Sequence, residues 1–428
     1  MFWFYRIVFL PALLVLAPRY LWRMRRRGGY RQKFQHRFGR GHDLPPKRPG
    51  VRRIWLQAVS VGEVLAIAPL LEALIKSGEA EVYLTTTTST GHRLADERYF
   101  GFVIGLGYFP IDWWLFSRRA WRDIDPDMVI LMEGERWPEH IHQANLRQVP
   151  VISINARTSD RSFRRLRNFG FANRLLFGGI DRLLPCSAQD EARFRQLGVP
   201  AEKIFTTGNI KLDLRIPRLT QAERTTLRTE LGGCEGFVLL GSSTWPGEEA
   251  ALLEAWQAAR NRGVECTLLL VPRHAERRGE LERLLREAQV GHHFRSRGPA
   301  PCRVAVTVAD TTGELRTLTQ LADLVFIGKS LPPNEGGQTP VEAAALEKPI
   351  LFGPEMSNFR TIARELVAAG AARQVTDQQA LTEVVCELLA DPARRERMAG
   401  AAGEWQRNNA GAVERTLAVI REELARLK

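Results

Sequence analysis

The stretch Gln57-Ala58-Val59-Ser60-Val61-Gly62-Glu63 joins an apolar run at residues 54–59 to an amphipathic pattern that starts at Val64. A short apolar run, a glycine turn and apolar residues every three or four positions predict a β-strand followed by an α-helix. Ser60 can cap that helix, Gly62 leaves room for a ligand against bare backbone, and Glu63 lies in the first helical turn. Either this is an ordinary capped helix start with a glutamate favoured by the helix dipole, or it is one edge of a ligand site.

Length and composition limit the number of domains and the kinds of partner that the chain can have. With 428 residues, 44% hydrophobic and 25% charged, the chain is too long for one ordinary core, and we expect two globular domains. The net charge of +13 predicts attraction to nucleic acid, an anionic membrane or a phosphorylated substrate. The five cysteines are scattered without a CxxC pair, which indicates reduced thiols in a cytosolic protein without a structural metal. They are Cys186, Cys234, Cys266, Cys302 and Cys386.

The N-terminal residues indicate which of these polyanions the chain binds. Residues 1–22 are rich in apolar and aromatic residues and lack a small-residue cleavage site, which favours a membrane anchor over a removed signal peptide. Residues 23–44 form a basic segment with no acidic residue before Asp43. Its cations are Arg23, Arg25, Arg26, Arg27, Arg31, Lys33, Arg37 and Arg40. Such a segment stays cytoplasmic and binds anionic headgroups at roughly 1 kcal/mol per charge. Most aromatics are not interleaved with the charges, so we expect no nucleic-acid partner, and whether the anchor spans the membrane or lies in it stays open.

Residues 45–212 repeat a strand–turn–helix pattern that predicts a parallel, doubly wound sheet. Strands are expected at residues 54–59, 81–86, 128–132, 151–154 and 182–186. Helices are expected from Val64, at residues 91–99, after Pro138 and at residues 189–197, with a basic loop after the fourth strand.

Polar residues follow the carboxyl ends of these strands, where such sheets bind ligands. They are residues 85–88, Glu133, Glu135, Asn155, Arg157, Ser187 and residues 208–211. Each alone is more often a cap or a loop ion pair, but five such ends favour a shared cleft. Glu133 and Glu135 flank Gly134, so one can face a ligand and the other the scaffold, unless both are simply exposed. The arginine-rich run at residues 157–169 is either a solvated face or a membrane-docking patch.

After a linker at residues 213–224, a second domain of the same kind is expected at residues 225–405, followed by a C-terminal helix at 406–428. A strand at 237–240 ends in Gly241-Ser242-Ser243-Thr244, a loop that can donate amides and hydroxyls to an anion. A strand at 266–271 ends in Pro272-Arg273-His274, where an arginine and an imidazole can reach one ligand, unless His274 is only a surface histidine.

Residues 322–345 carry the clearest nucleotide-binding pattern. A strand at 323–327 leads into a loop with three glycines at 328–337 and then a helix that starts at Pro340. Such a loop can cradle phosphate, and Glu342 can take ribose hydroxyls, although a plain surface loop is the alternative. We further expect a strand at 349–352 and helices at 359–368 and 404–427. Two Rossmann-like halves suggest the GT-B arrangement of nucleotide-sugar transferases, with a cleft between the domains. No metal is needed, because helix dipoles and cations can neutralise the leaving phosphate.

Seven ordered motifs resemble those of the 3-deoxy-D-manno-octulosonic acid (Kdo) transferases of lipid A biosynthesis over nearly the whole chain. They are Val59-Ser60-Val61-Gly62-Glu63, Glu133-Gly134-Glu135-Arg136-Trp137-Pro138, Asn155-Ala156-Arg157, Gly208-Asn209-Ile210-Lys211, Val271-Pro272-Arg273-His274, Asp310-Thr311-Thr312-Gly313-Glu314-Leu315 and Gly336-Gly337-Gln338-Thr339-Pro340-Val341-Glu342-Ala343-Ala344.

The resemblance implies an inverting transfer of Kdo from CMP-Kdo to a phosphorylated lipid A precursor at the cytoplasmic face of the inner membrane, without a cofactor. It implies that Glu63 is the general base and that Glu133 and Lys211 stabilise the transition state. The implied CMP-binding residues are Pro272, Arg273, His274, Thr312, Gly313, Glu314, Leu315, Thr339, Pro340, Val341 and Glu342. Other donor-loop residues are Ser242, Ser243, Thr244, Gly336, Gly337 and Gln338, and Ser60 and Gly62 lie on the acceptor side.

One motif departs from the family pattern. The family usually has Gly-Gly-His-Asn-Pro where this chain has Gly336-Gly337-Gln338-Thr339-Pro340, and the loop at residues 329–335 has an extra residue and two prolines. A related CMP- or UDP-sugar as donor therefore stays open. A third alternative is a membrane-tethered binding protein without activity, but the combination of Glu63, Glu133, Lys211, Arg273 and Glu342 argues against it. The sequence leaves open the number of sugars transferred, the acceptor hydroxyl and the oligomeric state.

Overall fold

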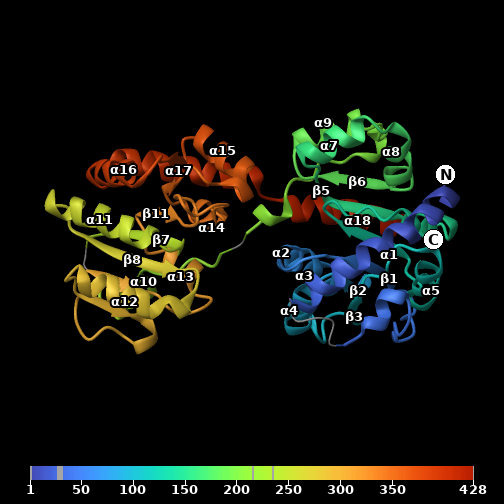
Figure 1. Ribbon diagram of the computed structural model, residues 1–428, viewed down its shortest axis with the longest axis horizontal. Helices are drawn as coiled ribbons and strands as arrows, with labels where there is room; N and C mark the ends of the chain where they lie inside the picture. The colour runs from blue at the N-terminus through green and yellow to red at the C-terminus, as the bar shows by residue number, and fades with distance from the viewer. Residues whose placement is uncertain (1, 27–31, 215, 234–235, 428) are drawn as a thin grey trace. The chain divides into compact units, whose positions relative to one another are not determined.

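The computed structural model describes residues 2–26, 32–214, 216–233 and 236–427. It divides into two compact units, Met1–Asp213 with Ala410–Lys428, and Leu214–Asn409. We call them the N-terminal unit and the C-terminal unit (Figure 1). Arg27, Arg31 and Cys234, which the sequence analysis includes, lie outside the described residues.

The N-terminal unit is built on a six-stranded sheet in the order β3-β2-β1-β4-β5-β6. Every neighbouring pair in it is parallel. The strands are β1 Arg52–Gln57, β2 Ala80–Thr86, β3 Gly105–Tyr108, β4 Met128–Met132, β5 Val151–Ala156 and β6 Arg182–Pro185. The strand order reverses between β1 and β4, so the crevice at this switch point is where such a sheet binds its ligand.

Both faces of this sheet are covered by helices, which explains why its strands are almost continuously apolar. Ile54 and Leu56 belong to a core with α3 (Ala68–Lys76) and α18 (Ala412–Arg426). Trp55 belongs to a core on the opposite face, together with residues of α5 (Trp114–Ile124) and α6 (Pro138–Leu146). The helices of the unit are α1 Phe2–Arg26, α2 Val61–Ala66, α3, α4 Ser89–Tyr99, α5 Trp114–Ile124, α6 Pro138–Leu146, α7 Asp160–Arg167, α8 Gly170–Phe177, α9 Ala188–Gln196 and α18. Short 3₁₀ helices are η1 Phe34–Phe38, η2 Ala201–Lys203 and η3 Ile210–Leu212.

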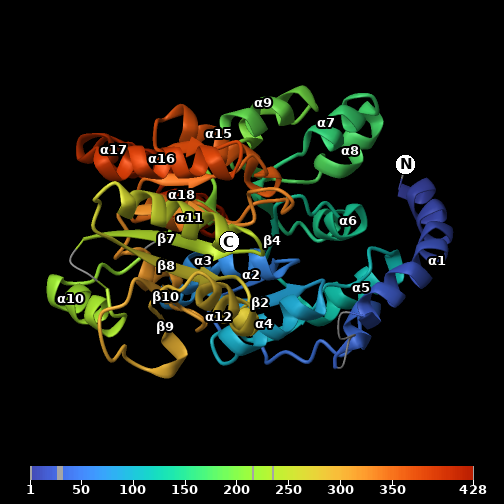
Figure 2. The ribbon, with the colours of Figure 1, turned by 60° about the vertical axis from the view of Figure 1, so that its left-hand side comes forward.

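The C-terminal unit has a seven-stranded parallel sheet in the order β13-β12-β11-β7-β8-β10-β9. The strands are β7 Phe237–Thr244, β8 Cys266–Pro272, β9 His292–Phe294, β10 Val306–Val308, β11 Leu324–Ile327, β12 Ile350–Phe352 and β13 Ala372–Gln374. One face of this sheet shares a large core with α11 (Glu248–Asn261) and α16 (Gln378–Ala390), which pack against each other (Figure 2).

The remaining helices of the C-terminal unit surround this core. They are α10 Gln221–Glu230, α12 Arg278–Glu287, α13 Leu315–Thr319, α14 Val341–Ala345, α15 Arg360–Ala368 and α17 Pro392–Asn409. Short 3₁₀ helices are η4 Ala275–Arg277, η5 Arg295–Arg297 and η6 Ser357–Phe359. Together the two units confirm the prediction of two Rossmann-like parallel-sheet domains and of a helix at the N-terminus.

Several local expectations are wrong. The stretch expected as a basic loop after β5 contains the helices α7 and α8, and strands β3, β9, β10 and β13 were not expected. Residues 242–244 continue strand β7 and do not form a free loop, with Ser243 at a bulge. The single helix expected at residues 404–427 is two helices, α17 and α18, because Gly411 turns the chain with φ 78°.

Two cations of the basic segment make contacts within the fold, and the binding of lipid headgroups by the rest of the segment stays a prediction. Arg37 is buried and donates to the carbonyl of Phe109, and the Lys33 ammonium donates to the carbonyl of Leu106 at 3.0 Å. These two cations hold η1 to the edge of the sheet. Arg40 is exposed.

Helix α18 completes the N-terminal unit although it is the last element of the chain. Ile420 is fully buried in its core, whereas the next residue, Arg421, makes a surface ion pair with Glu79 at 3.3 Å. We predict that Ile420→Ala lowers the free energy of unfolding of this unit by about 2–5 kcal/mol, and that Arg421→Ala lowers it by less than about 1 kcal/mol. Urea denaturation followed by amide hydrogen exchange in the N-terminal sheet measures both. Equal losses for the two variants would mean that α18 is not part of this core.

Candidate active site

Glu63 lies where strand β1 passes into helix α2, beside the switch point of the N-terminal sheet. Its carboxylate accepts the backbone N–H of Val59 at 2.8 Å and the hydroxyl of Ser60 at 3.1 Å. Ser60 stands at the N-cap of α2, as expected, but its hydroxyl donates to Glu63 and makes no side-chain cap bond among the described residues. The glutamate is held by the turn that precedes it, and Gly62, exposed in the first turn of α2, has nothing within 4 Å of where a Cβ would be.

Burial raises the pKa of the Glu63 carboxyl above its ordinary value, and the negative charge of Glu133 raises it further. The N–H of Val59, the hydroxyl of Ser60 and the Lys211 ammonium act in the opposite direction. A carboxylate with a raised pKa is a stronger base than a solvated one. The site thus contains a group suited to accept a proton.

Glu133 directly follows strand β4, the neighbour of β1 in the sheet. Its backbone is left-handed, with φ 56°, and its N–H donates to the carbonyl of Ile154 at 2.9 Å. Its Oε2 accepts from Arg157 Nη2 at 2.8 Å and Nε at 3.1 Å, and its Oε1 pairs with the Lys211 ammonium. A non-glycine residue in the left-handed region is unfavourable, and such residues are often found at functional sites. The backbone of Glu133 together with its two cations therefore indicates a functional position.

Two asparagines hold the segment that carries Lys211. Asn155, at the end of β5, accepts the N–H of Ile210 at 3.1 Å through its side-chain oxygen. Asn209 accepts the N–H of Lys211 at 3.0 Å in the same way. Three motifs that are far apart in the sequence, around residues 133, 155 and 209, therefore meet at one edge of the sheet, as the strand-end pattern predicts.

A third carboxyl belongs to this cluster. Burial raises the pKa of Glu135 to about 7, and the charge of Glu63 contributes to the shift. The Trp137 indole N–H donates to Glu135 Oε2 at 2.7 Å. From the sequence, Glu133 and Glu135 either divide between a ligand and the scaffold or are both exposed. Neither is exposed, and their surroundings differ: Glu133 lies between two cations, whereas Glu135 accepts from an indole and has a neighbouring carboxyl.

In the C-terminal unit, the buried carboxylate of Glu248 organises the loops at the ends of β7 and β11. It accepts four backbone N–H groups, from Trp245 at 2.9 Å, Lys329 at 2.8 Å, Ser330 at 2.8 Å and Leu331 at 3.1 Å. Glu248 was not predicted from the sequence. A signal was present, because Glu248 opens a helix directly after a strand-end turn, as Glu63 does.

Gly336 and Gly337 close the glycine-rich loop in a conformation that other residues rarely adopt. Their φ angles are 108° and 71°. A Cβ on Gly337 would lie 2.4 Å from Met356 Sδ, and one on Gly336 would lie 2.5 Å from Asn358 Nδ2. The loop therefore packs its backbone directly against the turn after β12. A cavity of about 400 Å³ opens at the same turn and is lined by residues that include Phe352, Met356 and Arg360.

An aromatic contact joins the ends of β7, β8 and β11. The Trp245 ring lies 4.6 Å from the Lys329 ammonium and meets His274 edge to face, with ring centroids 5.2 Å apart. His274 also lies 3.4 Å from Glu276. Arg273 is exposed, and its backbone N–H donates to the carbonyl of Thr244 at 3.0 Å. Pro272 is the last residue of β8.

The other expected donor-side residues also follow strand ends. Thr312 and Gly313 are exposed in the turn after β10, and Glu314 precedes α13, which begins at Leu315, and lies 3.5 Å from Arg295. Thr339 accepts the N–H of Val341 at 3.3 Å through its hydroxyl, and Pro340 stands at the N-cap of α14. Gln338 donates its backbone N–H to the carbonyl of Gly328 at 3.0 Å.

Several buried polar atoms at these strand ends have no hydrogen-bond partner among the described residues. They are Thr244 Oγ1, Trp245 Nε1 and Glu342 Oε2. The other oxygen of Glu342 lies 3.6 Å from Arg316, and burial raises the pKa of this carboxyl. Buried polar atoms are almost always paired, so this group indicates a place where a polar ligand supplies the missing partners.

Solved structures show which fold class the two units define. UDP-GlcNAc 2-epimerase from Neisseria meningitidis matches with a TM-score of 0.59 at 15% identity, over 86% of this chain and 100% of that one. The Anabaena protein HepE, solved with UDP, matches with a TM-score of 0.55 at 16% identity, over 88% and 100%. Two parallel doubly wound domains of this kind make the chain a GT-B-like α/β protein.

Sequence relatives narrow the class to one family. The family model of the 3-deoxy-D-manno-octulosonic-acid transferases (kdotransferases) matches residues 32–214. A 3-deoxy-D-manno-octulosonic acid transferase of Bordetella pertussis is 36% identical over 98% of this chain and 99% of its own length. A 3-deoxy-D-manno-octulosonic acid transferase of Haemophilus influenzae is 32% identical over 98% of this chain and 96% of its own length. The chain belongs to the 3-deoxy-D-manno-octulosonic acid transferase family of glycosyltransferases, and the resemblance seen in its motifs is confirmed.

The four bonds to Glu248 predict a local effect on the glycine-rich loop. Glu248→Gln replaces a charged acceptor and leaves at least one buried N–H poorly paired, which costs about 1.5–3 kcal/mol. We expect faster hydrogen exchange at the amides of residues 329–331, measured by mass spectrometry. The control is Glu254→Gln, an exposed position of the same helix. Unchanged exchange in Glu248→Gln would contradict the role of this carboxylate.

The raised pKa of Glu135 predicts a pH-dependent stability difference. Between about pH 4.5 and 7 the folded chain keeps a proton on Glu135 that the unfolded chain has released, so its contribution to stability falls as the pH rises. The free energy of unfolding of Glu135→Gln, relative to that of the wild type, should therefore rise by up to about 3 kcal/mol between pH 5 and pH 8. Urea denaturation at both pH values measures the difference. Glu72→Gln, whose side chain is 61% exposed, is the control, and a pH-independent difference for Glu135→Gln would refute the assignment.

Proposed function

We propose that this chain transfers Kdo from CMP-Kdo to a phosphorylated lipid A precursor, at the cytoplasmic face of the inner membrane, in lipopolysaccharide biosynthesis. The transferred sugar is the one that names the family and its curated relatives. The observation that carries the proposal is the Glu63 carboxylate, which the turn after β1 holds in place, with a raised pKa, beside the Glu133–Lys211 pair.

The reaction is a single inverting displacement. Glu63 accepts the proton of the acceptor hydroxyl while that oxygen forms a bond to the anomeric carbon of Kdo. The bond between this carbon and the phosphate oxygen breaks, and CMP leaves with the electron pair. The acceptor side is formed by the turn with Ser60 and Gly62, where the exposed glycine lets a sugar approach the backbone.

Lys211 and Arg157 supply positive charge beside the base. Glu133 neutralises one of these two cations, so the group keeps one net positive charge for the carboxylate of Kdo and for the charge that develops on the leaving phosphate. We assign the stabilisation of the transition state to Glu133, as the residue that positions the cations, and to Lys211. Arg157 is added to this pair because it holds the same carboxylate.

The donor site belongs to the C-terminal unit. We assign CMP binding to the strand-end residues Pro272, Arg273 and His274, to residues 312–315, and to Thr339 through Glu342, with Glu342 taking ribose hydroxyls. The unpartnered buried atoms of Thr244, Trp245 and Glu342 support this assignment. The loops after β7 and β11 complete the donor site, and the Glu248 carboxylate stabilises their conformation by accepting backbone N–H groups. The net charge of +13 suits a donor, an acceptor and a membrane that are all anionic.

The direct test is transfer by the detergent-solubilised chain, given CMP-Kdo and a tetraacylated lipid A precursor. We expect CMP release and Kdo-sized additions to the lipid mass, whose number gives the transfer count. Glu63→Gln should lower the rate by about 10²–10⁴-fold, because it removes the proton acceptor. Glu72→Gln, an exposed glutamate on the next helix, should leave the rate unchanged.

If the folded chain gives no product with CMP-Kdo, the result would favour a different sugar donor. Thr339 stands where the family usually has asparagine, so a screen of CMP- and UDP-sugars is the second arm. Full activity of Glu63→Gln on any donor would remove Glu63 as the base.

A further inference from the structure

Helix α1 presents a stripe of residues to the N-terminal unit and turns the rest of its surface outward. Its half-buried residues are Phe2, Tyr5, Arg6, Phe9, Leu13 and Ala17. Their spacing of three or four places them along one side of the helix. Trp3, Phe4, Ile7, Leu14, Val15 and Leu16 are between 62% and 78% exposed. Most of the outward face is therefore apolar side chain.

Two buried carboxylates hold the N-terminal end of α1. Arg6 Nε and Nη2 donate to the two oxygens of Glu139 at 2.8 and 2.9 Å, and the Tyr5 hydroxyl donates to Asp112 at 2.5 Å. Glu139 is 0% exposed and Asp112 is 1% exposed. Asp112 also accepts the N–H groups of Glu139 and His140 at the start of α6. Glu139 also accepts from Gln143 Nε2 at 2.8 Å, but a buried carboxylate without a cation is costly, so the unit is suited to receive the arginine.

The other end of α1 leads back to the same unit. Phe38 in η1 packs edge to face on Phe116 of α5, with ring centroids 5.3 Å apart. Gly39 approaches the carbonyl of Phe116 so closely that a Cβ would lie 2.0 Å from it. The helix is long and apolar enough to cross a bilayer over Phe2–Arg19. A crossing would separate Arg6 from Glu139, because the two ends would then lie on opposite sides of the membrane.

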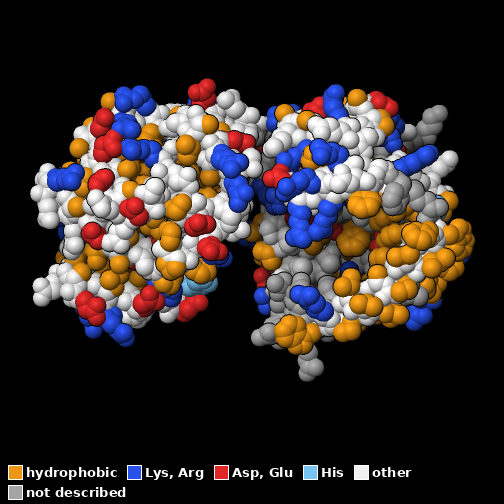
Figure 3. Space-filling view, turned by 45° about the horizontal axis from the view of Figure 1, so that its top comes forward, with side chains coloured by type: hydrophobic (Ala, Val, Ile, Leu, Met, Phe, Trp, Pro, Cys, Tyr) orange, Lys and Arg blue, Asp and Glu red, His pale blue; other side chains and the backbone are white. Residues whose placement is uncertain are grey.

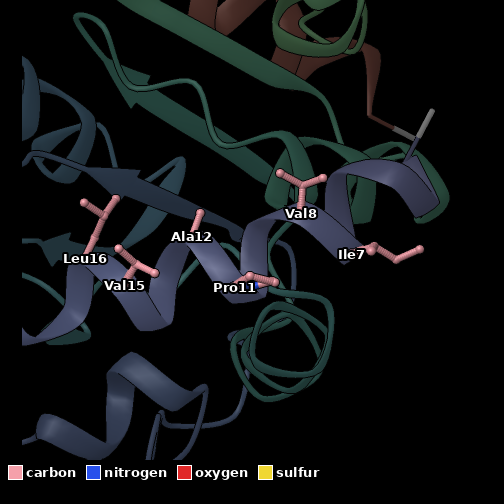
Figure 4. Close-up of a pocket in the computed structure, with 6 residues that line it drawn as sticks. All are labelled: Ile7, Val8, Pro11, Ala12, Val15 and Leu16. Atoms are coloured by element: carbon pink, nitrogen blue, oxygen red, sulfur yellow. The ribbon is translucent and has the colours of Figure 1, made fainter.

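We propose that α1 lies in the plane of the membrane, docked on the N-terminal unit by Arg6 and Tyr5, and inserts its outward face into one leaflet. The occupant of that face is the headgroup–acyl boundary of a bilayer that contains anionic phospholipid. Figure 4 shows a row of carbon-only side chains along α1, namely Ile7, Val8, Pro11, Ala12, Val15 and Leu16. Figure 3 shows hydrophobic side chains and Lys and Arg side chains gathered on one face of this unit. The inference rests on the membrane attachment proposed above and adds that the N-terminus stays on the side of the catalytic units.

The first experiment asks on which side residue 4 lies. Spheroplasts that produce the full chain with Phe4→Cys are treated with a membrane-impermeant maleimide, and the wild type gives the background of the native cysteines. An in-plane helix predicts labelling at the wild-type level in intact spheroplasts and additional labelling after detergent lysis. Labelling above background in intact spheroplasts would overturn the proposal, because only a spanning helix exposes residue 4 outside.

The second experiment tests the docking contacts by thermal unfolding of the solubilised chain. Arg6→Gln should lower the midpoint by about 5 °C or more, since it leaves the buried Glu139 carboxylate without its cation and with only the hydrogen bond from Gln143 Nε2 at 2.8 Å among the contacts described for it. Arg19→Gln removes the same charge from an exposed position of α1, without an ion-pair partner among the described residues, and should change the midpoint by about 1 °C or less. Tyr5→Phe, which removes one hydroxyl, is the milder variant if Arg6→Gln does not fold. Equal midpoints for the Arg6, Tyr5 and Arg19 variants would overturn the docking.

The third experiment identifies the occupant. The wild type should float with vesicles of phosphatidylcholine and phosphatidylglycerol, and the double variant Leu14→Glu, Val15→Glu should bind about tenfold less. Unchanged flotation with a changed oligomeric state would overturn the proposal in favour of a contact between copies. Kdo transfer by the wild-type preparation is measured in parallel, so a failure of the docking tests with transfer intact concerns only this inference.

Discussion

A carboxylate that leaves water must find a cation or several hydrogen-bond donors, and the structure uses this requirement repeatedly at the ends of its strands. Glu63 is held by a backbone N–H and a hydroxyl, Glu133 by an arginine and a lysine, and Glu248 by four backbone N–H groups. Glu139 receives an arginine from a helix more than a hundred residues earlier in the chain. Glu133, Glu139 and Glu248 each bind a segment that is distant in the sequence, whereas Glu63 is held by its own turn. The same kind of interaction therefore determines local geometry at Glu63 and brings separate loops together at the other three.

The part of this arrangement that is local in sequence could be predicted. Apolar runs followed by a glycine and a helical pattern identify the central strands, because parallel strands covered on both faces are almost continuously apolar. The carboxyl ends of such strands meet at one edge, so Glu63, Glu133 and Lys211 could be placed together before any coordinates were known. Short edge strands escaped prediction, as β3 shows, because its sequence Gly-Leu-Gly-Tyr lacks the β-branched residues that mark a strand.

What depends on tertiary contact could not be predicted. The sequence around Ser60 and Glu63 allows either side chain to bond the backbone at the start of the helix, and it does not show that the serine hydroxyl donates to the carboxylate instead. Glu248 looks like an ordinary first-turn glutamate until the loop that follows β11, about eighty residues later, folds onto it. The arginines of the N-terminal segment predict one lipid-binding cluster, but Arg37 is buried and donates to a backbone carbonyl inside the fold.

Helix α18 adds a condition on the order of events during synthesis. The ribosome delivers the first 213 residues long before Ala412–Arg426, yet the core of the N-terminal unit includes Val413, Leu417 and Ile420 from that helix. The C-terminal unit, by contrast, is continuous in sequence and can close its core as soon as it has emerged. The N-terminal unit therefore stays incomplete until α18 has been synthesised, and until then an apolar face of its sheet is uncovered. A nascent chain released before α18 would contain α1 and lack part of the core that supports the sheet next to Glu63.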